Sequence, residues 1–79
     1  MAEVELGEAG ARLLSSRRWP RLKKLDLRYT HLGDAGVAAL ARGAWPALEV
    51  LNLYGNFLTV PPTLGDVRRW APELERLIQ

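Results

Sequence analysis

The chain repeats itself after 26 residues. Shifting it by that length superimposes residues 6–28 on residues 32–54, and ten of the 23 paired positions are identical, both Trp-Pro pairs among them. A third copy begins at Ala71. A period in this range predicts stacked units, because one unit is too small to bury its own hydrophobic face. The repeat constrains the fold more than any other feature of the 79 residues.

Two leucine-rich stretches have the alternation that is typical of short strands. In LKKLDL, Leu25 and Leu27 point to one side while their neighbours point to the other. LEVLNL repeats this arrangement with Leu51 and Leu53. The leucines are expected to enter the core, and the alternating positions are expected to share the opposite sheet face: Lys24, Asp26, Arg28, Val50, Asn52 and Tyr54.

The residues between these strands have a helical pattern. Asp34 stands near the expected helix start, Val37 and Leu40 recur at helical spacing, and Gly43 is a plausible stop. The Trp-Pro pair then ends the connection, because proline cannot continue a helix. Each unit therefore reads as strand, turn, helix and return loop. We predict a single domain over residues 1–79, made of a partial unit at 1–21, units at 22–47 and 48–73, and a terminal segment at 72–79.

The third unit departs from the first two. Pro61 and Pro62 exclude a helix until about Thr63, so this segment is expected to be shorter or differently shaped. The final residues, PELERLIQ, fit two structures. They match a third strand in step with the first two, and they also match a capping helix with Pro72 in its first turn. Both alternatives stay open for residues 72–79.

A known repeat pattern, L-x-x-L-x-L-x-x-N-x-L, occurs at the start of the third unit as Leu48, Leu51, Leu53, Asn56 and Leu58. It recurs one unit earlier, with Thr30 at the asparagine position. This spacing resembles the leucine-rich repeat. The helical half, LGDAGVAALARG, resembles the ribonuclease-inhibitor-like subtype, and its GVAALA is similar to the GALA variant found in bacterial effector proteins.

The resemblance implies an α/β fold, a short leucine-rich-repeat solenoid with parallel strands on the concave face and helices on the convex face. It also implies that Asn56 bonds its side-chain amide to backbone groups of the turn, as a structural device. Leucine-rich repeats serve many functions on one scaffold. The resemblance therefore implies a class of mechanism and leaves the partner open.

Composition excludes several functions. The chain has no cysteine, so disulfides, thiolate nucleophiles and cysteine-bound metals are impossible, and a small chain without disulfides favours the cytoplasm. No run of about 18 apolar residues exists, so no membrane contact is expected. Nothing in the spacing places His31 beside Ser15 or Ser16 in a catalytic set. We expect no enzyme activity and no cofactor.

The outward strand residues are the best candidates for binding a partner, because tyrosine and arginine are enriched among binding hot spots. The sequence thus predicts a non-enzymatic protein–protein interaction module that uses its concave face. One alternative is a structural or capping segment of a larger assembly or of a homo-oligomer, since open strand edges invite pairing.

A second alternative comes from the charge pattern. The net charge is only +2, but six cations gather between residues 17 and 28, opposed by Asp26 alone. Such a patch favours phosphate or nucleic-acid binding. Nucleic acid is the weaker expectation, because the tyrosines do not interleave with the cations as a stacking platform. The cations are Arg17, Arg18, Arg21, Lys23, Lys24 and Arg28.

Overall fold

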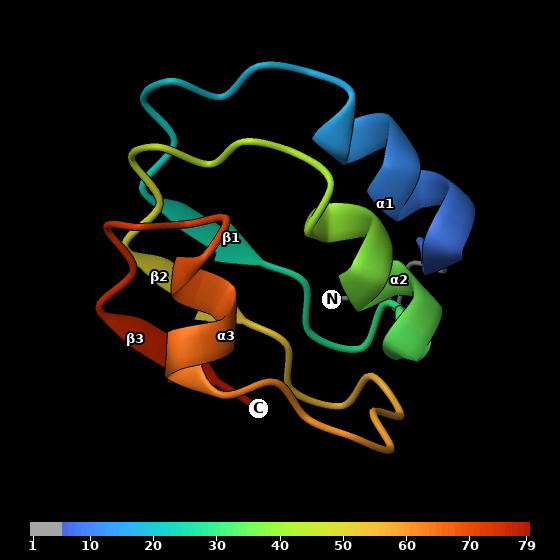
Figure 1. Ribbon diagram of the computed structural model, residues 1–79. Helices are drawn as coiled ribbons and strands as arrows, with labels where there is room; N and C mark the ends of the chain where they lie inside the picture. The colour runs from blue at the N-terminus through green and yellow to red at the C-terminus, as the bar shows by residue number, and fades with distance from the viewer. Residues whose placement is uncertain (1–5) are drawn as a thin grey trace.

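Helices and short parallel strands alternate along the chain (Figure 1). A computed structural model describes residues 6–79, and residues 1–5 of the predicted first unit lie outside the described part. The order agrees with the α/β class expected from the repeat. The elements are α1 (Gly7–Ser15), β1 (Lys24–Asp26), α2 (Gly33–Leu40), β2 (Val50–Asn52), α3 (Leu64–Arg68) and β3 (Arg76–Ile78).

The three strands form one parallel sheet in the order β1-β2-β3. Leu25 pairs with Leu51, and Leu51 pairs with Leu77, so each partner lies 26 residues further along the chain. The 26-residue period of the sequence therefore equals the separation along the chain between residues paired in neighbouring strands. The terminal segment, open between a strand and a capping helix, contains the strand β3.

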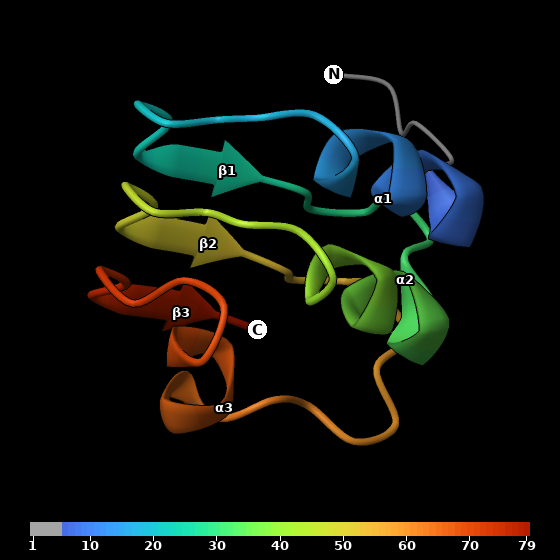
Figure 2. The ribbon, with the colours of Figure 1, turned by 45° about the horizontal axis from the view of Figure 1, so that its top comes forward.

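The core lies between the sheet and the helices, and α3 contributes the buried Val67 to it. Leu51, in the central strand, has no exposed surface, and Ala11 of α1 and Leu40 of α2 are equally buried. Small residues on the helices let α1 and α2 pack directly against each other, side by side beyond the ends of β1 and β2 (Figure 2). The buried hydrophobic residues are Ala11, Leu27, Leu32, Ala39, Leu40, Trp45, Leu48, Leu51, Leu53, Val67, Ala71 and Leu74.

Two tryptophans at equivalent positions close the core in the return loops. The rings of Trp19 and Trp45 stack, with centroids 6.3 Å apart and an interplanar angle of 3°. Each indole Nε1–H donates to a carbonyl near the end of the preceding helix, Trp19 to Leu14 at 2.8 Å and Trp45 to Leu40 at 2.9 Å. These bonds satisfy carbonyls that a helix end leaves without a helical partner. Trp70, from the third unit, is also packed against the core.

The third unit differs, as Pro61 and Pro62 predict. The helix α3 has five residues and begins after Thr63, which forms a capping box with Asp66. In Figures 1 and 2 this helix lies beside β3 and does not extend the layer formed by α1 and α2. Among residues 6–79, no helix has the length and apolar character needed to cross a bilayer.

Asp34 lies in the first turn of α2, as expected, but its side chain does not cap that helix. Its carboxylate accepts a hydrogen bond from the Thr59 backbone N–H at 3.1 Å and another from the Thr59 hydroxyl. The hydroxyl bond is the main reason that the pKa of Asp34 falls below its ordinary value, and desolvation opposes it only in part. Asp34 therefore ties the loop after β2 to the start of α2.

Candidate functional site

The six candidate binding residues come together on the face of the sheet that points away from the core. Lys24, Val50 and Arg76 form one row across the strands, and Asp26, Asn52 and Ile78 form the next. Lys24, Asp26, Arg28 and Tyr54 are exposed, while Val50 and Asn52 are half-buried by their neighbours. We call these residues, completed by Arg76 and Ile78 from β3, the outer sheet face.

Two of these positions hold the chain in the same way in successive units. The Asp26 carboxylate accepts from the Arg28 backbone N–H at 3.2 Å and from the Arg28 guanidinium at 3.0 Å. Asn52 accepts from the Tyr54 backbone N–H at 3.0 Å. The exposed Asp26–Arg28 ion pair adds little stability, but it fixes the direction of the guanidinium. Because the Asp26–Arg28 pair has no net charge, Lys24 and Arg76 give the outer sheet face a net positive charge.

The turns after the strands present two tyrosine rings beside this face. Tyr29 and Tyr54 meet edge to face, with ring centroids 5.5 Å apart, and both are about half exposed. The Tyr29 N–H donates to the Tyr54 carbonyl at 3.0 Å, so the backbone ladder continues past the strands. Gly55 makes room for this pair, because a Cβ there would lie 2.4 Å from Cδ1 of Tyr29.

Three aromatic residues in these turns have a left-handed backbone. The φ angles of Tyr29, His31 and Phe57 are 53°, 55° and 57°. This region costs a residue with a side chain about 1–2 kcal/mol, whereas glycine adopts it freely. Phe57 is 73% exposed and contacts His31, with ring centroids 5.5 Å apart. We call Tyr29, His31, Tyr54 and Phe57 the aromatic rim. Sequence reasoning missed Tyr29, His31 and Phe57 as candidates.

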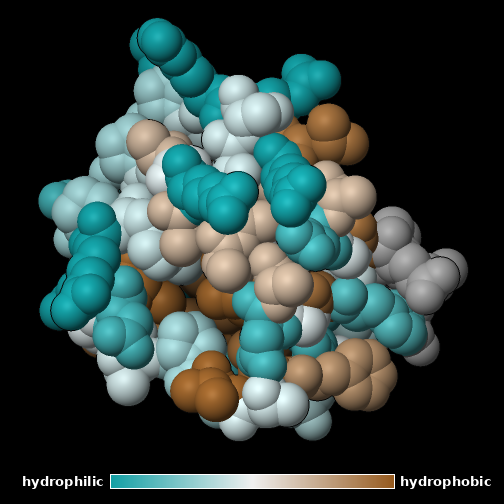
Figure 3. All heavy atoms as spheres, turned by 45° about the vertical axis from the view of Figure 1, so that its right-hand side comes forward, coloured by the Kyte–Doolittle hydropathy of each residue, from teal (hydrophilic) through white to brown (hydrophobic). Residues whose placement is uncertain are grey.

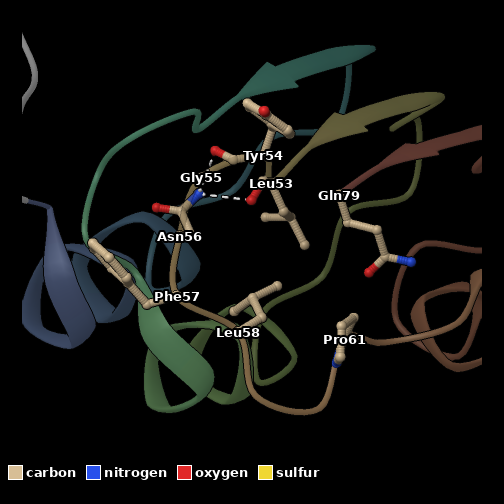
Figure 4. Close-up of a pocket in the computed structure, with 8 residues that line it drawn as sticks. All are labelled: Leu53, Tyr54, Gly55, Asn56, Phe57, Leu58, Pro61 and Gln79. Atoms are coloured by element: carbon tan, nitrogen blue, oxygen red, sulfur yellow. Dashed lines mark hydrogen bonds between the residues drawn. The ribbon is translucent and has the colours of Figure 1, made fainter.

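A small apolar cavity lies at the carboxyl end of β2, next to the aromatic rim (Figure 4). In Figure 4, Leu53, Leu58 and Pro61 surround the hollow, Gln79 approaches from the other side, and Phe57 points away from it. Its volume of about 270 Å³ suits one aliphatic or aromatic side chain. The lining residues are Leu53, Tyr54, Gly55, Asn56, Phe57, Leu58, Pro61 and Gln79.

Asn56 holds the turns of two units together. Its side chain is 2% exposed. Its Oδ1 accepts from the backbone N–H groups of Thr30 and Leu32, at 2.9 and 3.1 Å. Its Nδ2 donates to the carbonyls of Leu27 and Leu53, at 2.7 and 3.0 Å. The expectation that this amide bonds to backbone groups is confirmed. Asn56 supports the aromatic rim from below and is itself buried.

The basic stretch at residues 17–28 does not form one cluster. Lys24 and Arg28 belong to the outer sheet face, whereas Arg17 and Arg18 line a separate hollow between two return loops. Arg42, from the next unit, joins them there. Sequence reasoning missed Arg42, because the equivalent position one unit earlier is a serine.

The residues considered for a catalytic set have other contacts in the structure. The Ser15 hydroxyl donates to the Arg12 carbonyl at 3.1 Å, and the Ser16 hydroxyl donates to the Leu13 carbonyl at 2.8 Å. Both carbonyls belong to α1. His31 belongs to the aromatic rim. The two serines instead line the same hollow as Arg17, Arg18 and Arg42.

Comparison with protein-family models, with curated proteins and with solved structures finds no match to this chain.

Proposed function

We propose that this chain is a leucine-rich-repeat module that binds another protein without catalysing a reaction. The proposed architecture is a short solenoid with the outer sheet face on its concave side and α1 and α2 on its convex side. Three observations support it: the 26-residue register of the sheet, the bonds of Asn56 between two turns, and the paired roles of Trp19 and Trp45.

The backbone of the aromatic rim is the observation that carries the binding proposal. Tyr29, His31 and Phe57 each occupy a conformation that glycine would adopt at lower cost. Gly55 stands one unit after Tyr29 and has the same left-handed backbone, with a φ of 73°. Aromatic rings held exposed at such positions weaken the fold, so their presence favours a role outside it. Large rings beside a rigid sheet are typical binding anchors.

The charge and hydropathy of the outer sheet face indicate what it binds. Lys24 and Arg76 supply positive charge at one end of the strands, with apolar Val50 between them in the same row, and Ile78 adds apolar surface in the next row. An extended segment with acidic and aromatic or aliphatic side chains complements this surface. The strands hold these side chains about 4.8 Å apart before binding, which lowers the ordering cost of association. The cytoplasm, favoured by the lack of cysteine, is the proposed location.

Selection from a random peptide display library on the immobilised chain tests this function. We expect enriched peptides to combine acidic with aromatic or aliphatic residues. Tyr54→Ala should then weaken binding of a selected peptide about 30-fold or more, the loss typical of a hot spot. The matched control is Leu13→Ala, because Leu13 is exposed on α1, away from this face. Far-UV circular dichroism confirms that both variants fold. Equal affinity of the two variants would reject the outer sheet face as the binding surface.

A second candidate function is assembly with further repeats or with other copies of the chain. The strands β1 and β3 each have one neighbour in the sheet, and unpaired edges invite pairing. Light scattering over a range of concentrations tests it. A mass that rises with concentration supports assembly, and a constant monomer mass contradicts self-association.

A further inference from the structure

A second hollow lies between the return loops that follow α1 and α2, and it is distinct from the outer sheet face. Its volume is about 520 Å³, within the usual range for small-molecule sites. Figure 3 shows strongly hydrophilic side chains standing out over the upper part of the molecule, where these loops lie. The lining residues are Ser15, Ser16, Arg17, Arg18, Trp19, Pro20, Arg42, Gly43, Ala44 and Pro46.

The arginines of this hollow have no acidic partner within residues 6–79. The described ion pairs are Arg12–Glu8 and Arg28–Asp26, and neither includes Arg17, Arg18 or Arg42. Three arginines from two loops therefore line one hollow, and no carboxylate of residues 6–79 forms an ion pair with them. Like charges held together favour an anion that they can share.

The ends of α1 and α2 offset only part of this charge. Each helix C-terminus carries about half a negative charge, which cations near it stabilise. Trp19 and Trp45 already donate to one carbonyl at each end, at Leu14 and Leu40. Three guanidinium charges against two such ends leave a net positive charge of about two. Stabilising the helix ends thus does not account for all three arginines.

The walls of the hollow are already in place. Gly43 lies so close to α1 that a Cβ there would be 2.8 Å from Cβ of Ser15 and 3.0 Å from its carbonyl oxygen. This close approach holds the two loops together. The hydroxyls of Ser15 and Ser16 donate to helix carbonyls, so the arginines are the strongest donors among the residues that line the hollow. Trp19 adds an aromatic wall to it.

We infer that this hollow binds a small molecule that bears a phosphate or diphosphate group. A phosphate monoester has a charge of about −1.5 to −2 at neutral pH, which matches the uncompensated charge of the site. The planar guanidinium binds two phosphate oxygens at once, and arginines from two loops can hold the anion from two sides. The volume leaves room for the group attached to the phosphate, beside Trp19. This site is independent of the proposed protein-binding surface.

Isothermal titration calorimetry of the full chain with pyrophosphate, ADP and inorganic phosphate tests the inference. We expect saturable binding with one site per chain, weaker at about 200 mM salt than at about 50 mM. Arg42→Gln should weaken pyrophosphate binding about tenfold or more, the loss expected for a hydrogen bond to a charged group. Arg42→Lys should also weaken binding, because it keeps the charge and loses the two-pronged geometry.

The matched control is Arg21→Gln, which removes the same charge from the first return loop outside the hollow. It should leave the affinity nearly unchanged, and Tyr54→Ala should do the same. Equal losses of pyrophosphate affinity in Arg21→Gln and Arg42→Gln would show that the general positive potential of this surface attracts the anion. That result would overturn the site. Absence of binding to all three ligands, or tighter binding to an RNA oligonucleotide than to pyrophosphate, would also overturn it. Circular dichroism verifies that each variant folds.

Discussion

Replacing Asn56 by alanine should remove a large part of the stability of this fold. The amide lies between two turns, and its two ends bond to four backbone groups of Thr30, Leu32, Leu27 and Leu53. Alanine offers no donor or acceptor, so two N–H groups and the Leu53 carbonyl would lose this partner together, and the Leu27 carbonyl would keep only its bond from the Thr30 hydroxyl. Because Asn56 is 2% exposed, water does not reach these groups without rearrangement of the turns.

The size of the loss follows from the cost of leaving buried polar groups unpaired, about 1–3 kcal/mol for each. Some relaxation of the turns is expected, so we predict a loss of about 4 kcal/mol for Asn56→Ala. A chain of 79 residues has a total stability of roughly 4–12 kcal/mol. The variant should therefore be marginally folded or unfolded at room temperature.

The control is Asn52→Ala, which removes the same residue type from the outer sheet face. Asn52 is half-buried and accepts one hydrogen bond, from the Tyr54 N–H, so the expected loss is about 1 kcal/mol or less. Urea unfolding followed by far-UV circular dichroism measures both variants. If Asn56→Ala lost no more stability than Asn52→Ala, the buried amide would not hold the two turns together.

Two other substitutions test close contacts. Gly43→Ala should lower stability by about 1–3 kcal/mol in urea unfolding, because its Cβ would overlap the backbone of Ser15. Gly65 lies in α3, where an added Cβ would have its nearest neighbouring atom at 3.8 Å, so Gly65→Ala should raise stability by up to about 1 kcal/mol. If Gly65→Ala were the less stable of the two variants, this reasoning would be contradicted. Asp34 has a lowered pKa, so its bonds to Thr59 stabilise the fold above the unfolded pKa and are lost as pH falls through the folded pKa. Thr59→Val should raise that pKa in a carboxyl NMR titration, and an unchanged value would refute the assigned cause.

Much of the sheet could be predicted from the sequence because one rule is repeated. Leu25 and Leu27 alternate with polar residues, and the same alternation returns 26 residues later, so side-chain direction and register follow together. Pro61 and Pro62 likewise exclude a helix by their covalent structure, and α3 begins where they allow it. The end of the chain was ambiguous because PELERLIQ satisfies both a helical and an extended pattern.

The candidate sites were harder to predict, because they depend on contacts between units. Arg18 and Arg42 are 24 residues apart, and only the packing of successive return loops brings them to one hollow. The left-handed backbone of Phe57 could not be predicted from its residue type, because bulky side chains avoid that region, and the enrichment of histidine there gave only a weak signal for His31. Tyr29 had one available signal, its alignment with Gly55.

The paired tryptophans give this protein an internal optical probe. Trp19 and Trp45 are parallel and close, and each N–H is bound to the end of a different helix, so their coupled near-UV signal depends on α1 and α2 being docked. Trp70 belongs to the remaining unit and lies outside this stack. Repeating units that contact only their neighbours can separate one at a time. Comparing the near-UV ellipticity of the pair with the far-UV ellipticity of the whole chain therefore distinguishes unfolding that starts at one end of the chain from unfolding that happens everywhere at once.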